Sequence, residues 1–387
     1  MGRMTDRTAG NGEQQGHGGG GAGEAHRGAG GGAGPGRAGG GGRGQGAGGG
    51  QAGGGTAGGT GRGTGARPAR MPVVTQDRFG GPEVLRLTEA ERPRPLPTEV
   101  LVRVEAAGVN PVDAKTRAGQ GMAAVLGEPP FTVGWDVSGV VEEVGHGVTT
   151  LAPGDEVLGM PRFPHEAGAY AGYVTGPSRH FVRKPPEIGH VAAAALPLAA
   201  LTAWQILVDT AGVEAGRRVL VHAAAGGVGH LAVQIAKARG AHVTGTARAG
   251  KHAFLRRCGV DEAVDYTAGP FEEAVGDLDL VVDLVGSPGN QRRSLDVLRP
   301  GGLLVAVPGG LDPEAAALAA ERGLRATGFL VEPDRAGLAA LGRLVSEGRL
   351  SVEVAATLPL AEAAEAHRMI ETGRTTGKVV LLPGAAA

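Results

Sequence analysis

The sequence is short of cysteine, since Cys258 is the only one among its 387 residues. A single cysteine forms no disulfide within the chain and cannot supply a thiolate cluster for zinc. The chain also lacks any run of about 18 apolar residues, the length that a membrane-spanning helix needs, and it lacks the apolar region of a secretory signal. We therefore expect a cytoplasmic protein with no membrane partner.

An excess of charge of either sign is missing as well. The formal net charge is −1, and residues 71–387 hold 30 Lys and Arg against 36 Asp and Glu. A slightly negative balance provides no electrostatic footprint for a nucleic acid. We expect no nucleic-acid partner.

Glycine, in contrast, is abundant and unevenly placed. Of the 73 glycines, 32 fall in the first 70 residues, together with eight Arg, three acidic residues and almost no large apolar side chain. Such a segment cannot bury enough surface to offset its chain entropy, which predicts a disordered Gly-rich tail over 1–70. Because Met71 opens the strand-and-turn stretch "MPVVTQDRFGGPEVLRL", we hypothesise that the tail lies upstream of the true start, and N-terminal sequencing of the native protein tests this.

Two regions follow the tail. Residues 71 to about 190 contain short β-rich runs between Gly/Pro turns, such as "EVLVRVEAAGV" and "VSGVVEEVG", which indicates irregular β structure. A small-residue helix is expected over 192–208. Six β-rich runs then alternate with helix-capable segments, at 217–222, 241–246, 262–266, 278–285, 302–307 and 324–331. This alternation predicts an α/β class with a parallel sheet covered by helices on both faces.

The turn after the first of these runs reads "HAAAGGVGHLAVQIAKARG". The helix that follows has an apolar stripe at Val228, Leu231, Ala232, Ile235 and Ala236, and glycine ends it. A helix N-terminus offers unpaired N–H groups and partial positive charge, and glycine lets a pyrophosphate approach. The sequence therefore predicts a dinucleotide site, with Ala224 in place of the first glycine of the G-x-G-x-x-G pattern. The pyrophosphate is expected against Gly226, Gly227, Val228 and Gly229.

The end of the second strand bears on which dinucleotide binds. An NAD site places a carboxylate about 20 residues past the glycines, whereas this chain reads "VTGTARAGK". Arg248 and Lys251 pair with a 2′-phosphate that a carboxylate repels. The expected cofactor is NADPH, and the alternative is that both cations are merely solvated.

From Met71 onward the chain resembles the medium-chain dehydrogenase/reductase superfamily, in its zinc-independent quinone oxidoreductase, or zeta-crystallin-like, branch. The resemblance lies in "DRFGGPEVL", "AAGVNPVDAKTRAG", "GWDVSGVVEEVG", "GDEVLG", "LPLAALTAWQIL", "DLVVDLVG" and "GKVVLLP", beside the glycine turn. It implies a GroES-like β-rich catalytic domain over 71–195, a doubly wound Rossmann NADP-binding domain over 196–331, and a helix and strand over 332–387 that return to the catalytic domain. It also implies a homodimer that pairs the edge strands "LRATGFLV".

The zinc-dependent alcohol dehydrogenases of the same superfamily provide a comparison. Their catalytic metal is held by Cys, His and Cys, and the matching positions here are Asn110, Trp135 and Leu198. Amide, indole and isobutyl groups do not assemble a zinc site, so we expect no metal. Without a Lewis acid, alcohol oxidation is disfavoured, whereas a quinone or enone spreads the arriving charge through its own π system.

The resemblance also implies roles for single residues. Asn110 is expected near the reacting carbons, Lys115 stands where several members have a Tyr proton donor, and Tyr170 is a further aromatic near the cleft. Lys115 is expected to be a surface lysine, and the alternative is that Lys115 or water supplies the proton. The histidines at 222 and 230 are expected to be structural. The other cofactor-binding residues that the resemblance implies are Thr202, Tyr266, Val285, Val307, Phe329, Leu330 and Val331.

We thus expect an NADPH-dependent reductase of quinones, enones or similar activated double bonds, acting on a small-molecule substrate. Two alternatives remain open from the sequence. One is an enoyl thioester reductase, and the other is an NADPH-binding module with little turnover.

Overall fold

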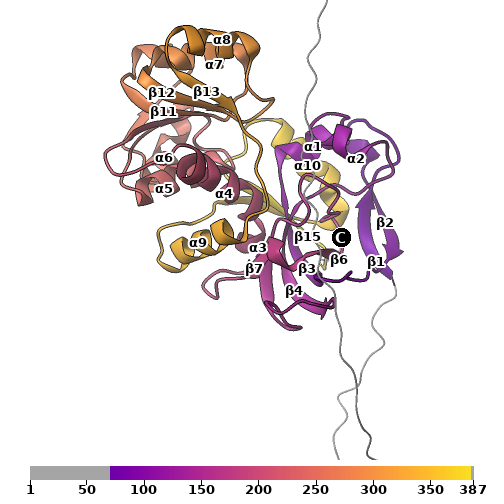
Figure 1. Ribbon diagram of the computed structural model, residues 1–387. Helices are drawn as coiled ribbons and strands as arrows, with labels where there is room; N and C mark the ends of the chain where they lie inside the picture. Colours follow the sequence, from indigo (N-terminus) through magenta and orange to yellow (C-terminus); the bar gives the residue numbers. More distant parts are fainter. Residues whose placement is uncertain (1–69, 385–387) are drawn as a thin grey trace, which may run out of the picture. The chain divides into compact units, whose positions relative to one another are not determined.

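The computed structural model describes residues 70–384, so the tail expected over 1–70 falls, but for its last residue, outside the described part (Figure 1). Within the described part, strands gather into a two-stranded, a six-stranded and a seven-stranded sheet. The two larger sheets correspond to the β-rich and the alternating regions of the sequence, and each has its own hydrophobic core.

The six-stranded sheet contains all six β-rich runs of the alternating region. Its spatial order is β10-β9-β8-β11-β12-β13, and every neighbouring pair is parallel. In order of sequence this is 3-2-1-4-5-6, the doubly wound order of dinucleotide-binding sheets. The strands are β8 (Arg218–Val221), β9 (His242–Thr246), β10 (Glu262–Val264), β11 (Leu278–Asp283), β12 (Leu298–Ala306) and β13 (Arg325–Gly328).

Helices cover both faces of this sheet because its strands are apolar on both sides (Figure 1). Along β8, Val219 and Val221 join one core cluster, whereas Leu220 between them joins another, as the two-residue period of a strand requires. The first face packs against α4 and α5, and the second against α7 and α8. The helices of this region are α4 (Pro197–Trp204), α5 (Gly229–Ala238), α6 (His252–Arg257), α7 (Pro288–Asp296), α8 (Pro313–Glu321) and α9 (Arg335–Ser346).

The seven-stranded sheet is mixed and includes a strand from the far end of the sequence. Its order is β14-β15-β3-β4-β5-β7, with β6 pairing to β3. β15 pairs antiparallel with β3, placing Val379 opposite Val109. The strands are β3 (Glu99–Val109), β4 (Asp136–Val144), β5 (Glu156–Gly159), β6 (Tyr173–Pro177), β7 (Phe181–Arg183), β14 (Val354–Pro359) and β15 (Lys378–Leu382), and a separate pair is formed by β1 (Arg70–Thr75) and β2 (Arg86–Glu91).

Smaller elements connect these sheets. Helix α1 follows β3 directly, and α10 precedes β15 across a short loop. The α-helices are α1 (Pro111–Arg117), α2 (Ala123–Leu126), α3 (His190–Ala194) and α10 (Ala363–Glu371). The short 3-10 turns are η1 (Pro82–Val84), η2 (Ser178–His180), η4 (Ala249–Lys251), η5 (Phe271–Glu273) and η6 (Leu360–Glu362).

The single helix expected over 192–208 is broken into three pieces. Helix α3 stops at Ala194, Pro197 begins α4, and a π-helical segment, η3 (Gln205–Thr210), follows. Proline lacks the N–H for a bond to the preceding turn, but it suits the first position of a new helix. The break is useful to the site, because it gives α4 its own N-terminus with the Leu198 N–H free to bond elsewhere.

Candidate functional site

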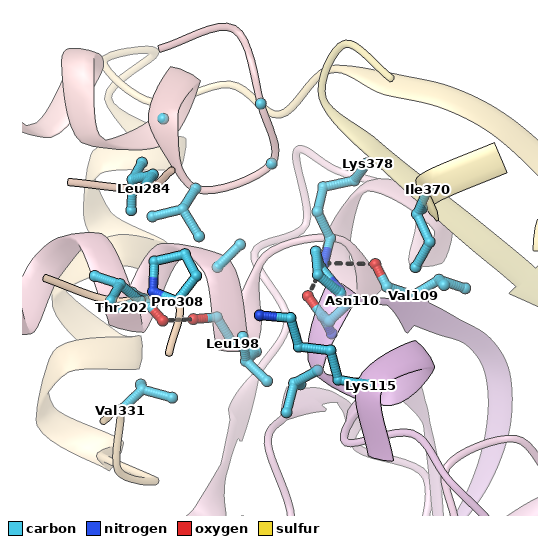
Figure 2. A pocket seen from close by; sticks show the side chains of 18 of the residues that line it. Val109, Asn110, Lys115, Leu198, Thr202, Leu284, Pro308, Val331, Ile370 and Lys378 are labelled. Carbon is cyan, nitrogen blue, oxygen red and sulfur yellow. Dashed lines mark hydrogen bonds between the residues drawn. The ribbon is translucent and has the colours of Figure 1, made fainter. Parts of the chain in front are cut away.

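A cavity of about 380 Å³ lies between residues of the two larger sheets (Figure 2). The first half of its lining comes from β3, α1 and β15, and the second from α4, the glycine turn and the ends of β12 and β13. Most of the lining is apolar. Its polar side chains are those of Asn110, Lys115, Thr202, Thr375 and Lys378.

The glycine turn follows β8 and forms one wall of the cavity. An added Cβ at Gly229 would lie 2.4 Å from the Ala223 carbonyl oxygen and 2.7 Å from the Ala224 Cα, so packing of turn against helix alone requires glycine there. At Gly226 the same Cβ would meet only the Ala223 oxygen, at 3.2 Å. Packing therefore restricts Gly226 much less than Gly229, and the bare backbone at Gly226 leaves space beside the start of α5. Gly226, Gly227, Val228 and Gly229 all line the cavity.

Helix α5 itself forms as its apolar spacing predicts. Leu231, Ala232, Ile235 and Ala236 are completely buried against the sheet. Gly240 has a φ of +83°, a conformation that glycine adopts without strain, and it ends the helix. The helix thus points its positive N-terminal end at the cavity.

The residues expected at the 2′-phosphate lie beyond the ends of β9 and β10. The Arg248 Nε donates a hydrogen bond to the Tyr266 hydroxyl at 3.2 Å. The Lys251 Nζ donates to the carbonyl oxygens of Arg374 and Thr375 at 2.8 and 3.4 Å, and partial burial lowers the pKa of Lys251. The structure therefore brings Arg248 and Tyr266 together, and ties Lys251 to the loop before β15.

The residues expected at the nicotinamide end divide into two groups. Thr202, Val307, Phe329, Leu330 and Val331 line the cavity, and the Thr202 hydroxyl donates to the Leu198 carbonyl at 2.7 Å. Val285 does not line it. The residue is 50% exposed, and Leu284 lines the cavity instead. Side chains alternate at the end of β11, so an expectation that is off by one residue selects the opposite face.

Asn110 and Lys115 both reach the cavity from α1. Asn110 caps the helix and is 2% exposed, with its Nδ2 donating to the Asp136 Oδ2 at 2.9 Å. Lys115 is exposed and lies one turn further on, and Figure 2 shows its ammonium extending toward Thr202 on the opposite wall. One buried amide and one exposed ammonium are thus the polar groups that α1 presents.

Tyr170 is not among the cavity residues. It is fully buried, and its hydroxyl donates to the Asp113 Oδ2 at 2.8 Å and lies 3.1 Å from the His367 Nε2. Its ring also packs so closely on Gly134 that an added Cβ there would lie 2.4 Å from the ring. The proximity to the cleft expected of Tyr170 is therefore not found, because these partners hold the side chain in the core of the seven-stranded sheet.

Two models of known protein families match the chain. An alcohol dehydrogenase GroES-like domain matches residues 96–186, and a zinc-binding dehydrogenase domain matches residues 258–381. The mitochondrial NAD(P)H oxidoreductase RTN4IP1 of Danio rerio is 32% identical over 82% of this chain and 92% of its own length. A 2-haloacrylate reductase from Burkholderia sp is 36% identical over 79% of this chain and 97% of its own length.

Solved structures agree with these relatives. A quinone oxidoreductase from Coxiella burnetii superimposes with a TM-score of 0.77 at 38% identity, covering 81% of this chain and 99% of the other. The quinone oxidoreductase of Escherichia coli, in complex with NADPH, gives 0.73 at 29% identity, with 81% and 100% covered. The chain belongs to the medium-chain dehydrogenase/reductase superfamily. Within this superfamily it falls in the quinone oxidoreductase-like branch.

The three residues that the resemblance places at the zinc-ligand positions have other contacts in the structure. Asn110 bonds to Asp136, the Trp135 indole N–H donates to the His165 carbonyl at 2.7 Å, and Leu198 presents an isobutyl group. Within residues 70–384 no three His, Cys, Asp or Glu side chains lie close enough together to hold a metal ion. Burial raises the pKa of the Cys258 thiol to about 11.

The two histidines that flank the glycine turn are buried and hydrogen-bonded, which agrees with the structural role expected of them. His222 lies 3.1 Å from both the Thr246 and the Ser294 hydroxyls. The His230 Nε2 accepts the Glu353 N–H at 3.1 Å. Burial lowers the pKa of His222 to about 3 and that of His230 to about 4, so both rings are neutral at neutral pH.

No helix of the described part is long and apolar enough to cross a membrane.

Three buried charged residues next to Asn110 were missed by reasoning from the sequence. Asp113 is fully buried, and burial raises its pKa to about 7 even though it accepts the Asn110 N–H at 2.8 Å. Asp136 and Lys378 form a buried ion pair at 3.3 Å beside Asn110. Two signals were available. Asp113 follows Asn110 by three residues, the spacing of a capping box, and Lys378 is a lysine that opens the otherwise apolar "KVVLL".

Proposed function

We propose that this chain is an NADPH-dependent oxidoreductase that transfers hydride to a quinone, an enone or a similar activated double bond. The observation that carries the proposal is the composition of the cavity. It has a bare turn, a helix N-terminus and the Thr202 hydroxyl in one half, an apolar surface at the strand ends, and amide and ammonium groups in the other half. The relatives named above, which include NAD(P)H and quinone oxidoreductases, support the same activity.

The proposed cofactor contacts follow the fold of the six-stranded sheet. The space beside Gly226 fits a pyrophosphate at the N-terminus of α5. The backbone from Gly226 through Val228 to Gly229 would contact this pyrophosphate. Arg248, Lys251 and Tyr266 surround the 2′-phosphate. The Thr202 hydroxyl oxygen, whose hydrogen is used on Leu198, accepts from the nicotinamide carboxamide. An apolar nicotinamide surface is provided by Leu284, Val307, Phe329, Leu330 and Val331.

The proposed chemistry needs no metal from the protein. Bound NADPH supplies a hydride to the β-carbon of a conjugated acceptor, whose π electrons move to the carbonyl oxygen. The Asn110 amide donates to this oxygen as its negative charge develops. A proton from the Lys115 ammonium or from water then completes the product at the α-carbon. We assign no proton transfer to Tyr170, since its hydroxyl is committed to Asp113 and burial raises its pKa well above 10.

Steady-state oxidation of NADPH tests the proposal directly. The purified chain is given benzoquinone, naphthoquinone, a simple enone and an enoyl thioester in parallel, with NADPH or NADH as donor. Turnover of a quinone or the enone with NADPH is the expected result. Turnover of the thioester alone replaces the proposed acceptor class, and binding of NADPH without turnover of any acceptor leaves a binding module.

We further propose that the protein is a cytoplasmic homodimer. The support for the homodimer is β13, an edge strand of the six-stranded sheet. In the described part of the chain one side of β13 pairs with β12 and its other side has no partner strand. Light scattering on the purified chain is expected to give a mass of twice 38.6 kDa, and a monomeric mass contradicts the proposal. Cell fractionation tests the location, which matters because the zebrafish relative is mitochondrial.

A further inference from the structure

Lys378 has contacts that the proposed cofactor and acceptor roles do not use. Its side chain is 3% exposed, and its Nζ donates to the Val109 carbonyl at 3.1 Å, to the Asn110 Oδ1, and to the Asp136 Oδ2 at 3.3 Å. These three acceptors use all three N–H groups of the ammonium. Figure 2 shows the bonds from Lys378 to Val109 and to Asn110. With the third bond to Asp136, Lys378 is unable to donate to a bound molecule without losing one of its buried partners.

The Asn110 amide lies between this ammonium and a carboxylate. Its Oδ1 accepts from Lys378, and its Nδ2 donates to the Asp136 Oδ2 at 2.9 Å. An ammonium is only a donor and a carboxylate is only an acceptor. A rotation of the amide by 180° would place NH₂ against the ammonium and oxygen against the carboxylate, so the two charged neighbours allow one orientation only.

Asp136 is fixed in turn by the start of α4. Its Oδ1 accepts the Leu198 N–H at 2.7 Å, the group released where Pro197 breaks the preceding helix. Asp136 is 0% exposed. The carboxylate thereby connects α4, which carries Thr202, to Asn110 on α1 and to Lys378 on β15. These three elements surround the cavity.

We infer that Lys378 and Asp136 are positioning residues that lock the Asn110 amide, so that its second N–H serves the acceptor oxygen. Asp136 is the one acceptor of the Asn110 Nδ2 in the described part of the chain, which leaves that second N–H for an atom in the cavity. This inference rests on the proposed function. It adds that the donor depends on a buried cation some 270 residues away along the chain.

A double-mutant cycle between Lys378 and Asn110 tests the inference. Lys378→Met keeps the aliphatic stem that packs on Gly227 and removes the ammonium. We expect Lys378→Met and Asn110→Ala each to lower kcat for the best acceptor roughly tenfold or more, as loss of an oriented donor does. The double variant is expected to be no slower than Asn110→Ala, because both changes remove the same interaction. The dissociation constant of NADPH is expected to change less than about threefold.

Lys184 provides the matched control. It is another buried lysine, with its Nζ donating to the Pro185 and Ile188 carbonyls at 3.2 and 2.7 Å, and it does not line the cavity. Lys184→Met is expected to leave kcat unchanged. Lys378→Arg, which keeps the charge and the donors, is expected to recover part of the activity. Multiplied losses in the double variant, or a tenfold loss of NADPH affinity at unchanged kcat in Lys378→Met, overturn the inference.

A second measurement does not depend on the acceptor. The side-chain ¹H–¹⁵N resonances of Asn110 are identified by their loss in Asn110→Ala. In the wild type one amide proton is expected to be protected from exchange, and this protection is expected to disappear in Lys378→Met, or in Lys378→Gln if the Met variant does not fold. Unchanged resonances contradict the lock even when turnover is observed, whereas absent turnover with a confirmed lock contradicts only the proposed function.

Discussion

Arg248 is the residue on which preference for a phosphorylated nucleotide depends in the proposed function. It follows the second strand of the sheet, where an NAD site places a carboxylate. Its guanidinium is exposed and held toward Tyr266, while Lys251 is held by two carbonyl oxygens. In the described part of the chain neither cation forms a close ion pair with an acidic side chain, although the nearby Asp265 contributes to raising the pKa of Arg248. Both cations therefore remain able to pair with a phosphate.

Replacing both cations tests this preference. Arg248→Gln/Lys251→Gln removes two positive charges from the adenosine end, so we expect the dissociation constant of NADPH to rise at least tenfold and that of NADH to change less than threefold. Fluorescence titration with each nucleotide measures both constants. Arg256→Gln, on the exposed surface of α6, serves as the control. Equal losses for the two nucleotides would remove the phosphate assignment.

At the scale of elements, the glycine turn and α5 have two separate requirements for glycine. Gly229 is required by packing, because backbone atoms of Ala223 and Ala224 lie where a Cβ would be. A Cβ at Gly226 would need only a small shift of the Ala223 carbonyl oxygen. The absence of a side chain at Gly226 therefore matters mainly to the binding of a molecule in the cavity. The two positions therefore separate stability from binding.

Two alanine variants measure this separation. Gly229→Ala is expected to lower the free energy of unfolding by about 2 kcal/mol through overpacking. Gly226→Ala is expected to unfold nearly like the wild type and to bind NADPH at least tenfold more weakly. Urea denaturation and nucleotide titration on both variants provide the comparison. A Gly226→Ala protein that binds NADPH normally would show that the pyrophosphate does not approach this backbone.

The elements were more predictable than the site, for a physical reason. The β-rich runs of the six-stranded sheet and the stripe of α5 are local patterns, and burial on both faces of the sheet enforces them. The lock around Asn110 joins residues 242 to 269 positions apart, and no local pattern contains it. Tyr170 and Val285 failed similarly, since the direction of a side chain depends on neighbours that only the folded chain supplies. The break of the helix at Pro197 was predictable from the sequence, because proline ends a helix, but the bond from the Leu198 N–H to Asp136 that this break permits was not.

At the scale of the whole molecule, buried titratable groups set how stability depends on pH. Burial raises the pKa of Asp113 from its ordinary 3.8 to about 7. The native state therefore holds a proton that the unfolded state has lost between these values, and stability falls as pH rises from about 4 to 7. Burial lowers the pKa of His367 to about 3. This group acts oppositely, and its contribution is lost as pH falls below 6.5.

Asp113→Asn isolates the first of these contributions. The groups that face Asp113 are the Tyr170 hydroxyl, Asp136 and Lys378, none of which is changed. We expect the unfolding free energy of Asp113→Asn, relative to wild type, to rise by about 2 kcal/mol between pH 5 and 7.5. Urea denaturation at both pH values measures it, with the exposed Asp77→Asn as control. A difference that stays constant with pH would mean that Asp113 ionises normally in the folded protein.

The pairing of β15 with β3 has a consequence for synthesis on the ribosome. Val379 emerges long after its partner Val109, by tens of seconds at ordinary translation rates. Until then β3 presents an unpaired edge and Asn110 lacks the lysine beside it. A nascent chain can thus complete its nucleotide sheet before the wall opposite exists, so chaperone capture during this interval would protect an edge that the finished protein never exposes.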